Sequence, residues 1–303
     1  ARINMPSLTD KDRANILYAI ENNIDFIAHS FVRSKQDILD IQEILDQHKS
    51  SIKIIAKIEN QEGVDNIDEI LQAAYGVMIA RGDLGIEIAQ EKIPGIQRLL
   101  IRKCVLAQKP VIVATQMLHS MIQNPRPTRA EVTDVANAIF YRTDALMLSG
   151  ETAYGKYPIE SVHTMSKIAE EAEKGKLSDN DIKIPHSTNE RDITSFLARQ
   201  AVESQQVLQT KAILTASYTG RTVRFLAAYR GSNPIYAMCP TKSLVRQLAL
   251  SYGVTPIFQV GDGHVRDYYL KALHNLVDRG LISVTDKVVY LSSNDRNGVS
   301  GTT

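Results

Sequence analysis

The sequence predicts an α/β protein in two parts, a parallel sheet built from about five βα units and a second, doubly wound α/β domain. The first observation is a pattern repeated five times in the first half, an apolar run followed by a polar cluster and a helical stretch. The second is that these runs are almost entirely apolar, as strands of a parallel sheet buried on both faces must be. The third is a polar, turn-forming segment around residues 174–189, after which a new αβ series begins.

The elements of the first half follow from the spacing of the apolar runs. The starts of the runs lie 25 to 34 residues apart, which is the length of a βα unit. We expect strands at Phe26–Phe31, Ile52–Ile58, Val77–Ala80, Val111–Ala114 and Ala145–Leu148. Helices fill the intervals, and three of them are expected to begin with capping boxes. These boxes are Thr9 with Asp12, Ser34 with Asp37, and Thr128 with Glu131.

The second half alternates helices and strands in the same way. We expect strands at Ala212–Thr215, Ile235–Met238, Pro256–Gln259 and Val288–Leu291. Helices are expected near Asp192–Leu208, Thr222–Tyr229, Ser243–Tyr252 and Asp267–Asp278. This alternation is typical of a doubly wound domain. We therefore divide the chain into a first domain at residues 1–175, a linker at 176–190 and a second domain at 191–303.

Composition excludes several classes of protein. Lys plus Arg is 35 and Asp plus Glu is 34, a net charge of +1, which argues against a nucleic-acid or membrane partner held by charge. A hydrophobic content of 44% excludes disorder of the whole chain. No apolar run approaches the roughly 18 residues of a membrane span. Cys104 and Cys239 are far apart and lack metal-ligand spacing, so we expect a reducing, cytoplasmic location.

Reactive polar residues follow all five expected strands of the first half. These endings are Ser30 to Arg33, Lys57 to Asn60, Arg81 to Asp83, Thr115 with Gln116, and Ser149 to Thr152. Chemistry in parallel α/β folds gathers at the carboxyl ends of the strands. Five such endings in register therefore predict one shared site.

Lys57 and Glu59 are two residues apart on a strand, so they should project from the same face. One interpretation is a structural ion pair. The other adds Asp83, so that two carboxylates hold one hard divalent cation while Lys57 stabilises developing negative charge. Gly82 fits the second interpretation, because a missing side chain lets a substrate anion approach backbone amides. These residues alone leave both interpretations open.

Five motifs, in this order, resemble pyruvate kinase of the bacterial type. They are KIENQEGV at 57–64, ARGDLGIE at 80–87, ATQML at 114–118, PRPTRAEVTDVANA at 125–138 and LSGETAYGKYP at 148–158. The resemblance extends more diffusely over the second domain. It implies that residues 1–175 are the C-terminal part of a (β/α)8 TIM-type barrel carrying catalysis, and that residues 191–303 form a domain of the effector-binding type.

The resemblance also implies roles for individual residues. Lys57 would stabilise the transition state of phosphoryl transfer, and Thr115 would lie beside the enolate carbon. Glu59 and Asp83 would hold Mg²⁺ or Mn²⁺, and Lys57, Gly82, Asp83 and Thr115 would bind substrate. The implied reaction transfers a phosphoryl group from phosphoenolpyruvate to ADP, giving pyruvate and ATP in the last step of glycolysis. K⁺, with ligands outside this chain, and a homotetramer of the full-length protein are implied as well.

A hydroxyl-rich segment joins a strand to a helix in the second domain. Its candidate ligand residues are Thr215, Ser217, Thr219, Gly220 and Thr222. The segment is either an ordinary βα turn with capping hydroxyls or a phosphate cradle at a helix start. The family resemblance implies the second, a site for a sugar-phosphate effector.

The family's first three barrel strands and its lid domain have no counterpart in the matched sequence. We therefore expect a truncated form of a longer enzyme, with two unpaired edges on its sheet. Two alternatives stay open. One is a catalytically inactive fragment that retains only effector or subunit binding. The other is a metal-dependent aldolase acting on pyruvate enolate, which does not account for the five motifs together.

Overall fold

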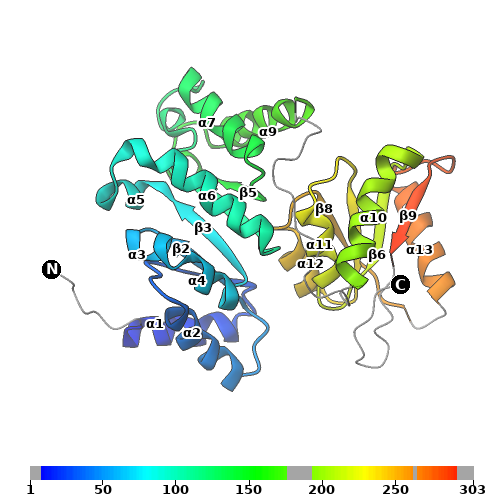
Figure 1. Cartoon of the computed structure of the whole chain (residues 1–303), viewed down its shortest axis with the longest axis horizontal. Coiled ribbons are helices and arrows are strands. Elements are labelled where there is room, and N and C mark those ends of the chain that lie inside the picture. Colours follow the sequence, from blue (N-terminus) through cyan, green and yellow to red (C-terminus); the bar gives the residue numbers. More distant parts are fainter. Residues whose placement is uncertain (1–7, 176–192, 262–264, 292–303) are drawn as a thin grey trace. The chain divides into compact units, whose positions relative to one another are not determined.

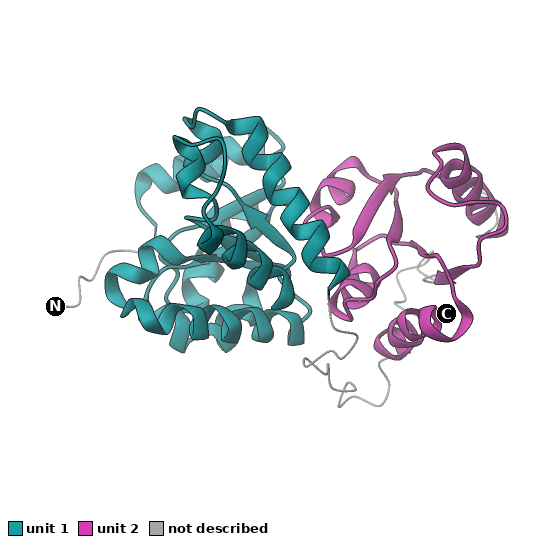
Figure 2. Ribbon diagram, turned by 90° about the horizontal axis from the view of Figure 1, so that it is seen from above, with its two compact units in different colours: residues 1–183 teal, residues 184–303 magenta. Residues whose placement is uncertain are grey.

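The chain divides into two compact units, residues 1–183 and residues 184–303 (Figure 2). The computed structural model describes residues 8–175, 193–261 and 265–291. The linker expected at residues 176–190 lies outside the described residues. The domain limits that the sequence suggests therefore stay a prediction.

Unit 1 is built around a parallel sheet of five strands in the order β1-β2-β3-β4-β5 (Figure 1). The strands are β1 (Phe26–His29), β2 (Lys53–Ile58), β3 (Gly76–Ala80), β4 (Val111–Ala114) and β5 (Ala145–Met147). All five were predicted, within two residues at each end. β1 stops before the expected Phe31 because Phe31 has a left-handed φ of 54°, which an extended strand cannot contain.

Helices follow the strands of unit 1, as in a βα repeat. They are α1 (Asp10–Glu21), α2 (Lys35–Gln47), α3 (Gln61–Asp65), α4 (Ile67–Ala73), α5 (Arg81–Glu87), α6 (Ile93–Leu106), α7 (Arg129–Phe140), α8 (Gly150–Ala153) and α9 (Pro158–Lys174), with short 3₁₀ turns η1 (Gln90–Lys92) and η2 (His119–Ile122). Capping boxes begin α1, α2 and α7, which confirms the three that were predicted. α2, α4 and α6 pack side by side against the sheet (Figure 1).

The sequence led us to expect that all five strands of this sheet are buried on both faces, and the structure corrects this for two of them. β3 and β4 are buried along their whole length, as apolar strands of a parallel sheet should be. β1 and β5 are only half-buried, and Ala28 in β1 is exposed. Among the described residues these two strands each pair with one neighbour, so the sheet has the two open edges that the sequence led us to expect.

Unit 2 holds a parallel sheet of four strands in the order β8-β7-β6-β9. The strands are β6 (Ala212–Ala216), β7 (Ile235–Cys239), β8 (Val254–Phe258) and β9 (Val288–Leu291), and the helices are α10 (Ile193–Leu208), α11 (Arg221–Ala228), α12 (Lys242–Leu248) and α13 (Val265–Asp278). The strand order reverses at β6, which is the mark of a doubly wound fold. α12 ends earlier than the Tyr252 that was expected.

Two apolar cores lie on opposite faces of this second sheet. Ile213 of β6 packs with α10, α11 and α12, whereas its neighbour Leu214 packs with α13. Successive strand residues point to opposite faces, so the side chains of β6 alternate between the two cores. Helices therefore cover both sides of the sheet, and the predicted doubly wound α/β fold is confirmed.

Within residues 8–175, 193–261 and 265–291, no helix combines the length and the apolar character needed to cross a membrane.

Candidate functional site

The carboxyl end of β2 carries an ammonium group beside a carboxylate. Lys57 Nζ lies 2.8 Å from Glu59 Oε1, so the two side chains share a face, as their spacing predicted. Lys57 Nζ also donates a hydrogen bond of 2.8 Å to Ser30 Oγ, beyond the end of β1. The Lys57 side chain is 25% exposed and that of Glu59 only 1%. The pair thus presents its cation to solvent and keeps its carboxylate buried.

A second bond fixes the Glu59 carboxylate. Glu59 Oε2 accepts a hydrogen bond of 2.6 Å from the backbone N–H of Phe31, a residue with a left-handed φ of 54°. A buried carboxylate needs partners of this kind, because an unpaired buried charge is costly. The structural ion pair anticipated from the sequence therefore exists. Each carboxylate oxygen still has a lone pair beyond the one that these bonds use.

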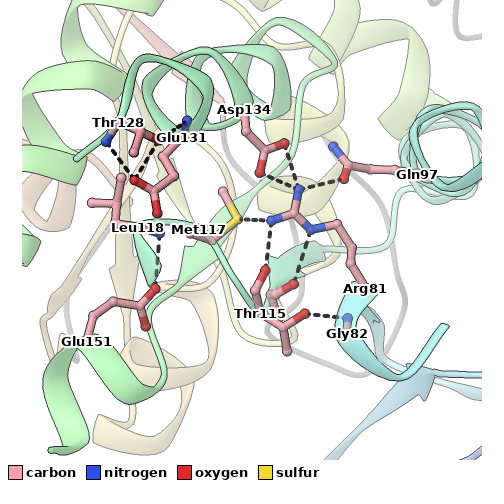
Figure 3. Close-up of polar contacts among 11 residues, drawn as sticks. Arg81, Gly82, Gln97, Thr115, Met117, Leu118, Thr128, Glu131, Asp134 and Glu151 are labelled. Carbon is pink, nitrogen blue, oxygen red and sulfur yellow. Dashed lines mark hydrogen bonds and ion pairs between the residues drawn. The ribbon is translucent and has the colours of Figure 1, made fainter. Parts of the chain in front are cut away.

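Gly82 and Asp83 lie in the first turn of α5, which begins directly after β3. The Gly82 N–H donates a hydrogen bond of 2.8 Å to Thr115 Oγ1, at the end of β4 (Figure 3). The sequence suggested an amide open to an anion, and here that amide is already engaged. An anion that binds it must share or replace the Thr115 hydroxyl. The Asp83 carboxylate is half-buried and makes no hydrogen bond or ion pair to any residue that the structure describes.

Thr115 and Gln116 both have left-handed backbones, with φ of 67° and 55°. Two such residues in succession are unusual, above all when one is β-branched. They turn the chain sharply at the end of β4. The Arg81 guanidinium donates to the Thr115 carbonyl at 2.7 Å on the inner side of this turn.

Sequence reasoning placed Arg81 and Glu151 among the polar strand endings and Glu131 in a capping box, but it gave none of these three charges a role in the turn after β4. Glu151 is 1% exposed, and its carboxylate accepts a hydrogen bond of 3.0 Å from the Leu118 N–H (Figure 3). It also accepts one of 2.8 Å from the Ser149 N–H. These bonds tie the segment after β4 to the end of β5. A signal was present, because Arg81 directly follows an apolar run and Glu151 lies three residues after one, but nothing in the sequence named their partners.

Glu131 was predicted only as part of a capping box. Its carboxylate also accepts from Ser120, through the backbone N–H at 2.7 Å and the hydroxyl at 2.6 Å. Burial raises the pKa of Glu131, but its hydrogen bonds from Ser120 and Thr128 outweigh burial and hold that pKa below its ordinary value. The first turn of α7 is thereby fastened to η2.

The donor set can be compared with what a divalent cation needs. Across residues 8–175, 193–261 and 265–291, no group of three or more His, Cys, Asp or Glu side chains is placed to hold a metal ion. Glu59 and Asp83 supply two carboxylates at the ends of neighbouring strands. Mg²⁺ is commonly held through one or two carboxylates, with water and substrate phosphate oxygens completing its shell. These two residues fit that pattern.

The hydroxyl-rich loop of unit 2 lies between β6 and α11. Ser217 Oγ accepts the Gly220 N–H at 2.9 Å, and Gly220 has a φ of 76°, so the loop is a tight turn. Thr215 and Thr222 are buried, and Thr219 is exposed. The loop leaves β6, where the strand order reverses, which is where ligands bind in doubly wound folds. The geometry is compatible with both interpretations of this loop.

Comparisons with known proteins agree with this architecture. The family model described as pyruvate kinase, barrel domain, matches residues 1–162, and the model described as pyruvate kinase, alpha/beta domain, matches residues 196–303. A pyruvate kinase of Borreliella burgdorferi is 44% identical, over 99% of this chain and 63% of its own length. A pyruvate kinase of Geobacillus stearothermophilus is 52% identical, over 84% of this chain and 43% of its own length.

A solved structure gives the same answer. The crystal structure of a pyruvate kinase from Cryptosporidium parvum matches with a TM-score of 0.89 and 36% identity, over all of this chain and 63% of that one. The chain spans 43 to 64% of the lengths of the curated relatives that it matches. Both domain models, the relatives and the fold confirm the resemblance seen in the motifs, and this chain belongs to the pyruvate kinase family.

Proposed function

We propose that unit 1 carries the phosphoryl-transfer site of a pyruvate kinase, which moves the phosphoryl group of phosphoenolpyruvate to ADP and yields pyruvate and ATP. The observation that carries this proposal is the partly exposed Lys57 ammonium held 2.8 Å from the buried Glu59 carboxylate. Asp83 and Thr115 follow the next two strands of the same sheet. An ammonium group, two carboxylates and a hydroxyl thus lie at the carboxyl ends of three neighbouring strands.

Lys57 is suited to stabilise a phosphoryl group in transfer. An ammonium has three N–H donors, and two of them are used by Glu59 and Ser30. The third is available to a phosphoryl oxygen on the solvent side. Because its position is fixed before substrate binds, Lys57 can offset developing charge without reorganising.

Glu59 and Asp83 are the residues that would hold Mg²⁺ or Mn²⁺. When bound, such a cation neutralises charge on the phosphoryl and enolate oxygens. The Asp83 carboxylate has no competing hydrogen bond or ion pair among the residues described, so it is ready for a ligand. The family resemblance adds K⁺ as a second cation.

Thr115 is proposed to act at the enolate carbon. Its hydroxyl oxygen accepts the Gly82 N–H, which leaves the hydroxyl hydrogen free to be donated elsewhere. A water chain linked to Thr115 would deliver the proton that converts enolpyruvate to pyruvate. Methyl protonation that continues at an unchanged rate in Thr115→Val would remove this role.

The test is pyruvate formation from phosphoenolpyruvate and ADP, with Mg²⁺ and K⁺, by the purified chain. Loss of one preorganised donor typically costs a factor of about 10²–10³ in rate, and we expect Lys57→Met to lose at least that. Lys103→Met is the matched control, because Lys103 forms an ion pair with Asp68 on an exposed surface. Lys57→Met with the activity of Lys103→Met would refute the assignment.

Two other outcomes favour the alternatives. A folded chain without turnover would favour a fragment that retains only effector or subunit binding. Metal-dependent release of pyruvate from a hydroxy-keto acid, without phosphoryl transfer, would favour an aldolase.

Unit 2 is proposed to bind a sugar-phosphate effector at the loop from Thr215 to Thr222. The strand-order reversal at β6 and the exposed Thr219 support this proposal. Calorimetric titration with sugar phosphates should show heat that Thr219→Val reduces, and absence of heat would count against the site. A homotetramer of the full-length protein is proposed from the family, and a cytoplasmic location from the two buried cysteine thiols, Cys104 and Cys239.

A further inference from the structure

One guanidinium occupies the inner side of the turn after β4. Arg81 is the first residue of α5, and its side chain is 11% exposed. It donates to the carbonyls of Thr115 at 2.7 Å and Ala114 at 3.4 Å. On its other side it meets both carboxylate oxygens of Asp134, at 2.7 and 2.6 Å (Figure 3).

These contacts hold the peptide groups on both sides of Thr115. The Ala114 carbonyl belongs to the peptide before Thr115, and the Thr115 carbonyl to the peptide after it. Hydrogen bonds to both carbonyls restrain the φ and ψ of Thr115, whose left-handed φ of 67° is unfavourable for a β-branched residue. The conformation needs such support from its surroundings.

The side chain of Thr115 is held by the residue next to Arg81. The Gly82 N–H donates to Thr115 Oγ1 at 2.8 Å. Parallel pairing of Ala80 with Ala114 brings the ends of β3 and β4 level, so consecutive residues of α5 meet Thr115 from two directions. Arg81 holds the backbone of Thr115, and the Gly82 N–H donates to the Thr115 hydroxyl.

We propose that Arg81 is a positioning residue, which fixes the Thr115 turn so that the Thr115 hydroxyl meets the Gly82 amide. Asp134 on α7 orients the Arg81 fork, with Gln97 of α6 accepting at 3.3 Å. Arginine is required because its planar fork reaches two carbonyls and a carboxylate at once, whereas the lysine ammonium is a compact point charge. The catalytic consequence of this role rests on the proposed function, but the positioning itself does not.

The test measures hydrogen exchange of the Gly82 amide by NMR on the full chain. We expect Arg81→Lys to raise the exchange rate of this amide at least about tenfold, because its acceptor is no longer held in place. Arg33→Lys is the matched control, because Arg33 also follows a strand and pairs with an aspartate, Asp37, at 3.4 Å. It should leave Gly82 exchange unchanged. Equal exchange in the two variants would overturn the proposal.

A second variant covers the case in which Arg81→Lys fails to fold. Asp134→Asn keeps Arg81 and removes only the charge that orients it, at a side chain that is 34% exposed. It should raise the exchange rate of the Gly82 amide above that of the parent chain, and no change in this variant would also overturn the proposal.

Turnover separates positioning from general stability. In Arg81→Lys we expect kcat to fall by about tenfold to a hundredfold while KM for ADP stays within about twofold. If kcat falls only in proportion to the fraction of folded protein, Arg81 contributes to stability alone. If the parent chain shows no turnover, the proposed function fails, and the Gly82 exchange rates still decide the positioning role.

Discussion

The Lys57–Glu59 pair makes a quantitative prediction about stability. Lys57→Met leaves the Glu59 carboxylate, which is 1% exposed, with the Phe31 N–H as its one partner among the described residues. At 2.8 Å the attraction between unit charges is about 6 kcal/mol for an effective dielectric constant of about 20. Water reaches the 25% exposed lysine and reduces this figure. We expect Lys57→Met to lower the free energy of unfolding of unit 1 by about 2–4 kcal/mol.

A double-mutant cycle isolates the pair. In Lys57→Met the buried Glu59 carboxylate loses its ammonium partner, and Glu59→Gln removes that unpaired charge. The double variant should therefore be more stable than the sum of the two single effects predicts, with a coupling energy of about 2 kcal/mol. The measurement is urea unfolding at pH 7, fitted separately for the two units because the chain is not one cooperative domain.

The chain supplies a control cycle. Lys103 and Asp68 form an ion pair at 2.6 Å whose side chains are 31% and 72% exposed. Exposed pairs contribute about 0–1 kcal/mol, so Lys103→Met with Asp68→Asn should show a coupling below that of Lys57 and Glu59. Equal coupling in the two cycles would refute the view that burial makes the Lys57–Glu59 pair strong.

Two further predictions concern Gly82 and His29. A Cβ added at Gly82 would lie 3.5 to 4.0 Å from Thr115, whereas one at Gly85 would meet nothing within 4 Å. Both Gly→Ala variants should keep or gain up to about 1 kcal/mol in unfolding free energy, but in calorimetry only Gly82→Ala should weaken phosphoenolpyruvate binding. Burial lowers the pKa of His29 below its ordinary value of 6.5, although Asp37, Asp12 and Asp40 oppose this. The unfolded chain then binds the proton more readily, so stability should fall as pH drops below about 6.5, and His29→Gln should flatten this slope in urea melts at pH 7.5 and 5.5.

Much of the fold was predictable because burial leaves a clear pattern. The apolar runs at Val77–Ala80 and Val111–Ala114 match β3 and β4 closely, since strands buried on both faces must be apolar throughout. The shared face of Lys57 and Glu59 followed from the period of two in a strand. These features depend on local chain geometry alone, so they could be predicted from the sequence.

The contacts between strand ends were not predictable. Arg81 meets Thr115 across 34 positions of sequence, and only the register of β3 against β4 brings the two together. The left-handed backbones of Phe31 and Thr115 left no mark in composition, because neither residue favours that region. The burial of Thr215 was equally hidden, because a hydroxyl at a strand end can face either core or solvent.

The most direct test of the account is Mn²⁺ binding to the purified chain in the presence of phosphoenolpyruvate, followed by the electron paramagnetic resonance signal of free Mn²⁺. If Glu59 and Asp83 hold the catalytic cation, the chain should bind one Mn²⁺, and Asp83→Asn should weaken that binding by about tenfold or more. Asp68→Asn, at a side chain that is 72% exposed, should bind Mn²⁺ as the parent does. Unchanged Mn²⁺ binding in both Asp83→Asn and Glu59→Gln would contradict the account.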